Sequence, residues 1–144
     1  MNVTLKSRLS ALALAAALGG GACDTVPLPT LPTSATNDIF FSSQLMAKGT
    51  TTRSFKVAKA GEVKVLFTSM LPETAVVVRV ALGTWNGTTC SPTTTIDTAA
   101  GSTTAIITTT LAVGDYCISL SDLNTLTKTN DFSLTVTVPN PSAS

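Results

Sequence analysis

The residues that could carry acid–base or nucleophilic chemistry in this chain are few, and their types restrict the reactions available. The 144-residue sequence contains no histidine, which excludes Ser-His-Asp and Cys-His catalysis and histidine-based zinc or iron sites. Hydrolysis by paired carboxylates needs two acids at a defined separation in a cleft. The acids of the chain after residue 37 fall mainly at expected strand ends and turns, where turn preferences explain them. They are Asp38, Glu62, Glu73, Asp97, Asp115, Asp122 and Asp131. We therefore expect a protein that is not an enzyme.

The first 22 residues have the features of a secretory signal in the usual order. Lys6 and Arg8 supply the positive start, residues 9–18 form an apolar run, and the small residues 19–22 follow. Such segments direct export and are then removed. We predict a signal peptide over residues 1–22 and a mature chain outside the cytoplasm.

The residues before Cys23 resemble the lipobox of bacterial lipoproteins, with Gly20 at the position where that family prefers leucine. The resemblance implies lipid on the Cys23 thiol, cleavage before it, and a membrane anchor in the bacterial cell envelope, in the periplasm or at the cell surface. Ordinary signal-peptidase cleavage near Ala22 is an alternative that leaves Cys23 as a free or pairing thiol. A membrane-spanning helix is a third, although the uncharged run is about half of the ~20 residues needed.

The other two cysteines follow from this assignment. The chain has three cysteines, and an odd one in a secreted protein needs an explanation. If Cys23 carries lipid, Cys90 and Cys117 form an even pair in an oxidising compartment where disulfides persist. Loop closure by this bond would contribute about 3–4 kcal/mol. Two unpaired buried thiols are the alternative.

Composition divides the remaining chain into a spacer, a domain and a tail. Residues 23–37 combine the lipidated cysteine with a Pro-rich linker that should be semi-rigid. Residues 38–139 suffice for one domain with its own core, and residues 140–144 form a polar tail. Removal of residues 1–22 leaves seven basic residues against eight acidic ones. Nucleic acid is therefore excluded as a partner, since its binding needs clustered Lys and Arg.

Alternation at period two, interrupted by turn residues, dominates residues 38–139, and no stretch keeps a helical period. In the clearest strand, Phe132, Leu134, Val136 and Val138 point inward and hydroxyl residues point outward. The strand candidates are 38–45, 55–57, 63–67, 76–82, 104–111, 116–120 and 132–138. Seven or eight short antiparallel strands without helices predict an all-β fold, a single β-sandwich of jelly-roll or Greek-key type.

One predicted strand carries two structural devices. Tyr116 and residues 118 and 120 should face inward, whereas Cys117 and Ser119 face the other way. The disulfide would then hold the Cys90 loop across the outside of this strand. Tyr116 follows a glycine turn and is similar to the tyrosine corner of β-sandwiches, so we expect a structural role for it.

Two places could hold a ligand. Asp122, Asn124, Asn130 and Asp131 flank one loop and offer oxygen atoms to a hard cation such as Ca²⁺, although turn preferences place such residues there equally well. We expect no other cofactor.

Trp85, the single tryptophan, lies beside Asn86-Gly87, a two-residue hairpin signal. Its ring and Asn86 could contact a sugar or a protein partner, or the ring could simply cover an edge of the sandwich near Cys90.

Four segments resemble the bacterial pre-peptidase C-terminal domain, namely residues 54–63, 82–90, 111–117 and 133–139. The resemblance implies a small β-sandwich that accompanies secreted enzymes or occurs alone in short lipoproteins, and that is not itself catalytic. We expect a non-catalytic, lipid-anchored cell-envelope module that is structural or contacts envelope proteins. A carbohydrate- or peptide-binding accessory module at the cell surface is the alternative.

Overall fold

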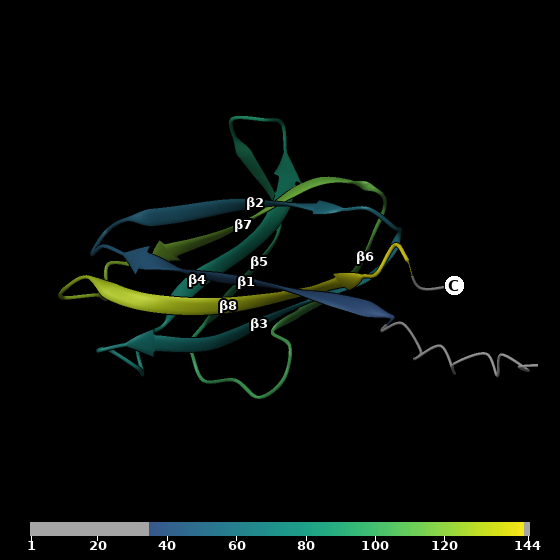
Figure 1. Ribbon diagram of the computed structural model, residues 1–144. Coiled ribbons are helices and arrows are strands. Elements are labelled where there is room, and N and C mark those ends of the chain that lie inside the picture. Colours follow the sequence, from purple (N-terminus) through teal and green to yellow (C-terminus); the bar gives the residue numbers. More distant parts are fainter. Residues whose placement is uncertain (1–34, 143–144) are drawn as a thin grey trace, which may run out of the picture. The chain divides into compact units, whose positions relative to one another are not determined.

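The computed structural model describes residues 35–142, which form eight strands and no helix (Figure 1). The predicted signal peptide 1–22, the predicted lipidation site Cys23, most of the linker and the last two residues lie outside the described residues. The strands are β1 (Thr36–Leu45), β2 (Thr50–Val57), β3 (Gly61–Leu71), β4 (Val78–Trp85), β5 (Cys90–Thr98), β6 (Ile107–Leu111), β7 (Gly114–Asp122) and β8 (Asn130–Pro139). β1 thus includes the last two residues of the expected linker.

The strands form two antiparallel four-stranded sheets, ordered β1-β8-β3-β6 and β2-β7-β4-β5. The pairs β1–β8, β2–β7, β3–β6 and β4–β5 are those of one long hairpin rolled up on itself, which is the jelly-roll arrangement. The predicted all-β sandwich of jelly-roll type is therefore confirmed. Figure 1 shows the two layers, with β2 and β7 in one and β1 and β8 in the other.

The core lies between the sheets and is built by the alternation that the sequence predicts. The inward residues of β8, from Phe132 to Val138, are at most 5% exposed, and Phe67 of β3 is fully buried. Val80 and Leu82 of β4 and Leu120 of β7 face them from the other sheet. Because one face of each sheet packs against this core, a shift of register by one residue would expose it, so the pairing is well determined.

The observed strands differ from the predicted ones in several bounds, and three of these differences concern β4, β5 and β6. β4 begins at Val78, so Val76 packs against the core from the preceding loop. β6 begins at Ile107, later than the predicted 104, and Ile107 takes the buried inward position. Residues 90–98, expected to include a loop, form the strand β5. Its Thr-rich sequence has little apolar alternation because it is a largely exposed edge strand that relies on backbone pairing with β4.

β7 is buried on both faces around Cys117. Register places Tyr116, Ile118 and Leu120 on the inward face and Cys117 and Ser119 on the outward face, as predicted. However, Cys117 is fully buried and Ser119 is only 8% exposed. At Cys117 the cover comes from the start of β5, which folds back over the sheet.

No helix within residues 35–142 is long and apolar enough to cross a membrane.

Candidate functional site

The hairpin that joins β4 to β5 projects from the sandwich and carries Trp85 at its base (the teal loop at the top of Figure 1). Its connection has four residues, 86–89, instead of the predicted two. The Asn86 side-chain oxygen accepts hydrogen bonds from the backbone N–H of Thr88 at 3.0 Å and of Thr89 at 2.7 Å. Gly87 has a φ of 99°, which favours glycine. Asn86 and Gly87 therefore lie in the turn as predicted, and the Asn86 side chain closes it.

The predicted disulfide between Cys90 and Cys117 is confirmed, with Cα atoms 5.7 Å apart. β4 lies between the two bonded strands in the sheet. Neighbouring strands are about 4.8 Å apart, so an undistorted sheet would separate β5 from β7 by roughly twice that distance. The start of β5 must therefore bend across β4 toward β7, and it does so where the register of β4 and β5 shifts after Leu82.

Gly83 makes this crossing possible. A Cβ atom at Gly83 would overlap the carbonyl oxygen of Ser91 and lie 2.8 Å from the Pro92 Cα. Glycine is required here because the backbone of β5 passes directly over it. The glycine and the disulfide together fix the folded-back hairpin above the outer face of the sheet.

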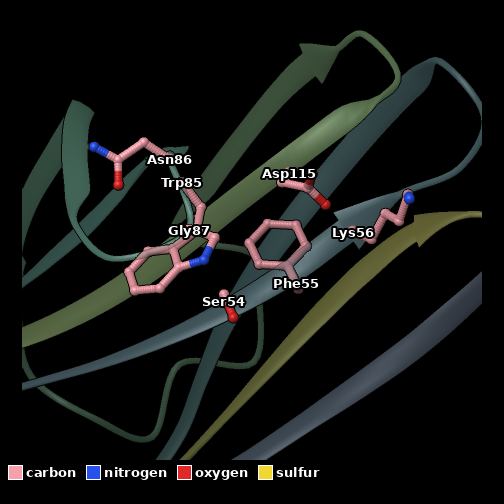
Figure 2. Close-up of a pocket in the computed structure, with 7 residues that line it drawn as sticks. All are labelled: Ser54, Phe55, Lys56, Trp85, Asn86, Gly87 and Asp115. Atoms are coloured by element: carbon pink, nitrogen blue, oxygen red, sulfur yellow. The ribbon is translucent and has the colours of Figure 1, made fainter.

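Beside the folded hairpin lies an open hollow of about 590 Å³ that we call the hairpin hollow (Figure 2). This volume falls in the range of about 300–1,000 Å³ usual for ligand sites. Figure 2 shows Trp85 and Lys56 at opposite ends of the group, with Phe55 and Asp115 between them. The lining residues are Ser54, Phe55 and Lys56 of β2, Asp115 of β7, Trp85 of β4, and Asn86 and Gly87 of the turn.

Strand register explains why these residues meet. Lys56 pairs directly with Asp115, and both point outward. On the other side of β7, Thr84 pairs with Tyr116, so the next residues along the two strands are Trp85 and Asp115. The aromatic ring, the carboxylate and the ammonium group therefore form one row across three adjacent strands.

Three polar side chains that line the hairpin hollow form no bond within the fold. Within residues 35–142, the side chains of Ser54, Lys56 and Asp115 make no hydrogen bond and no ion pair shorter than 4.0 Å. By contrast, another outward pair of opposite charges on neighbouring strands is hydrogen-bonded. Arg79 and Asp97, the corresponding opposite charges on β4 and β5, are joined by two hydrogen bonds of 2.7 and 2.8 Å.

Aromatic packing supports the hollow from the core side. The Phe55 ring lies between those of Phe41 and Tyr116, with centroids 6.3 and 6.0 Å away. The Tyr116 hydroxyl donates to the carbonyl oxygen of Ala112, four residues upstream, at 3.1 Å. This bond confirms the predicted corner role of Tyr116 and leaves its hydroxyl occupied.

The residues predicted as calcium ligands lie at the opposite end of β7, and the fold uses their oxygen atoms. The Asp122 carboxylate accepts hydrogen bonds from the N–H of Lys48 at 2.6 Å, Thr125 at 2.9 Å and Leu126 at 3.1 Å, and from the Thr125 hydroxyl at 3.2 Å. Burial raises the pKa of Asp122, but these hydrogen bonds outweigh it and hold the pKa below its ordinary value.

Asn130 is fully buried and pairs with Glu73, a residue the sequence did not single out for this role. The Asn130 oxygen accepts from the Glu73 N–H at 2.7 Å, and its nitrogen donates to the Glu73 carboxylate at 2.7 Å. The Thr127 hydroxyl donates to the same carboxylate at 2.7 Å. Hydrogen bonds from Thr127 and Asn130 lower the pKa of Glu73.

The other two predicted ligands stand apart from these networks. Asn124 is exposed in the loop with a φ of 64°, a conformation that asparagine tolerates better than most residues. Asp131 accepts a hydrogen bond from the Gln44 amide at 3.0 Å. Among the described residues no three His, Cys, Asp or Glu side chains form a group that could hold a metal ion. Calcium binding at Asp122, Asn124, Asn130 and Asp131 stays a prediction.

Of the two predicted ligand contacts, Trp85 and Asn86 both line the hairpin hollow, but the Asn86 oxygen is occupied by the turn. Figure 2 shows its amide pointing away from Phe55. Sequence reasoning missed Ser54, Phe55, Lys56 and Asp115 as neighbours of Trp85. No local signal could reveal them, because they join Trp85 only through the pairing of β2, β7 and β4.

Comparison with known proteins finds a distant structural similarity. No family model and no curated protein matches the chain. A solved structure described as "Bacillus endospore appendages form a novel family of disulfide-linked pili" is similar over 73% of this chain and 88% of its own, with 16% sequence identity and a TM-score of 0.37.

Proposed function

We propose that this protein is a non-catalytic, lipid-anchored module of the bacterial cell envelope with a structural or protein-interaction role. The Cys90–Cys117 bond is the observation that carries the proposal. Disulfides persist in oxidising compartments, and this one uses two of the three cysteines. Cys23 is then the one cysteine left for a lipid. A pre-peptidase C-terminal-like identity for the sandwich is part of the same proposal.

The lowered pKa values of three carboxylates support a role without catalysis. General acids are usually held in apolar surroundings that raise their pKa. Glu73 and Asp122 instead have lowered pKa values because backbone and side-chain donors surround them. The pKa of Asp97 is likewise lowered by hydrogen bonds from Arg79. These carboxylates stabilise loops and strand pairs, a role that needs no proton transfer.

The mass of the full-length protein recovered from membranes tests the proposal. We expect an acylated chain that begins at Cys23 and weighs two hydrogens less than its reduced form. A Cys23→Ala variant should appear in the soluble fraction with the same disulfide. An unmodified wild-type chain in the soluble fraction would contradict the anchor, and free thiols at Cys90 and Cys117 would contradict the export argument.

Ligand binding at the hairpin hollow is a second candidate function. The observation that favours it is the unbonded state of Ser54, Lys56 and Asp115 beside the Trp85 ring. This function is compatible with an anchored module, which would present the hollow to envelope polymers.

A further inference from the structure

We propose that the hairpin hollow is a carbohydrate site in which the Trp85 ring stacks on an uncharged pyranose ring. The proposal rests on the binding function suggested above for the same hollow and does not depend on the lipid anchor. Its basis is the row of Trp85, Asp115 and Lys56 across three strands, with the Ser54 hydroxyl beside it.

The chemistry of a sugar ring matches this mixture of groups. A pyranose has a face of C–H groups that packs on an aromatic ring and a rim of hydroxyls that both donate and accept hydrogen bonds. Trp85 supplies the flat apolar surface and is only partly buried. The ammonium of Lys56 can donate, the carboxylate of Asp115 can accept, and the hydroxyl of Ser54 can do either.

The charges favour an uncharged ligand. Lys56 and Asp115 carry opposite charges at directly paired positions, so their fields largely cancel within the hollow. An anionic or cationic polymer would gain from one of these groups and be repelled by the other. Sugar hydroxyls can bond to both without a charge of their own.

The hollow is also preorganised. The disulfide and the close crossing at Gly83 fix the hairpin, and the Asn86 side chain closes its turn. A ring held in place before binding loses little conformational freedom when the ligand arrives, which reduces the cost of association. Phe55, packed between Phe41 and Tyr116, gives the floor of the hollow the same rigidity.

A peptide would use this region differently. β2 is an edge strand of its sheet, so an extended peptide would add to it through backbone hydrogen bonds. Such binding would depend on the edge of β2 and would tolerate the loss of the Trp85 ring. Removal of that ring therefore separates the two kinds of ligand.

Binding by the full-length protein can be measured directly, because Trp85 is the single tryptophan and reports on its own site. Cello-oligosaccharides and chito-oligosaccharides of increasing length serve as probes, with insoluble cellulose and chitin as uncharged polymers for co-sedimentation. We expect a saturable change in tryptophan emission with at least one of these sugars, and the same affinity by calorimetry.

Variants then assign the binding to the hollow. Trp85→Ala should weaken calorimetric binding about tenfold or more, as expected for the loss of a stacked aromatic ring. Asp115→Asn and Lys56→Gln should each weaken it about threefold, and both are exposed positions where the fold should persist. Phe40→Ala is the matched control, because Phe40 is an aromatic residue 74% exposed on the other sheet.

The proposal is overturned if no probe changes the emission or gives heat. It is equally overturned if binding persists in all three hollow variants, or if only peptides bind and do so without Trp85. An unlipidated chain that still binds sugar would contradict the anchor alone, whereas an anchored chain indifferent to every sugar would contradict this site alone.

Discussion

β7 carries an aspartate near each end, and the two have opposite relations to the fold. Asp122, its last residue, accepts four hydrogen bonds. Asp115, its second residue, accepts none from the side chains or backbone of residues 35–142. Residue type and strand are the same, so the difference lies in what surrounds each end of β7.

At the Asp122 end of β7, two loops present backbone N–H groups that need hydrogen-bond acceptors. The β1–β2 turn and the loop after β7 both bring backbone N–H groups that no strand partner satisfies, and Asp122 accepts them. At the Asp115 end, the hairpin folds over the sheet and leaves the polar groups facing an open hollow. The Asp122 carboxylate stabilises the fold because it accepts hydrogen bonds from loop N–H groups. The Asp115 carboxylate accepts none from residues 35–142 and is available to a ligand.

Removal of the disulfide should have the largest effect and would test whether the hairpin end depends on covalent closure. The bond spans 27 residues, so the Cys90→Ala/Cys117→Ala variant should lose about 3–4 kcal/mol of unfolding free energy. Its Trp85 emission should also shift to longer wavelength as the hairpin detaches. Denaturant unfolding measures the loss, with Cys23→Ala as the control. An unchanged unfolding midpoint would show that the hairpin is held by other contacts.

A second comparison sets a buried asparagine against an exposed one. Asn130→Ala removes the acceptor of the Glu73 N–H and one donor to the Glu73 carboxylate, which keeps Thr127, and it empties a fully buried position, so it should cost about 2 kcal/mol. Asn86→Ala also removes hydrogen bonds to two backbone N–H groups. Because that turn is exposed, water can replace them, and we expect a cost below about 1 kcal/mol. Equal costs in thermal unfolding would contradict the contrast between the two ends.

Acid should weaken the Asp122 end through its lowered pKa values. The pKa values of Glu73 and Asp122 are lower in the folded chain than their ordinary values of 4.5 and 3.8. The unfolded chain therefore binds more protons in acid, so the stabilisation present above these values is lost as the pH falls through them. Glu73→Gln and Asp122→Asn should flatten this dependence, measured as unfolding midpoint against pH. Phe40→Ala should keep the wild-type slope.

Sequence patterns predicted the sandwich because burial imposes period two on its core strands. Phe132 to Val138 and Val63 to Phe67 alternate for this reason and lie where expected. β5 was missed because an exposed edge strand needs no apolar alternation. The predicted disulfide already placed the Cys90 segment across the outside of β7, but the bend of β5 that brings it there was not predicted, because a glycine at position 83 does not reveal what crosses it.

The candidate site could be predicted only in part for a similar reason. The sequence indicated Trp85 and Asn86 as ligand contacts because the single tryptophan stands beside a turn signal. Their neighbours Lys56 and Asp115 are distant in sequence, and only the register of β2 with β7 brings them together. Asp122 and Asn130 were recognised as a cluster of oxygen donors, but which partners they take depends on Lys48 and Glu73 from two other loops.

The smallest expected effect on stability belongs to the charges of the hairpin hollow, and it bears most directly on the comparison. Asp115→Asn and Lys56→Gln remove no hydrogen bond present within residues 35–142, so each should change the unfolding free energy by less than about 0.5 kcal/mol. Asp122→Asn, made in the same strand, should be clearly more destabilising at neutral pH, because an amide presents only one acceptor oxygen to donors that now share two. If Asp115→Asn proved as destabilising as Asp122→Asn, the carboxylate would have a structural partner. The hairpin hollow would then be no freer to bind a ligand than the loop end of β7.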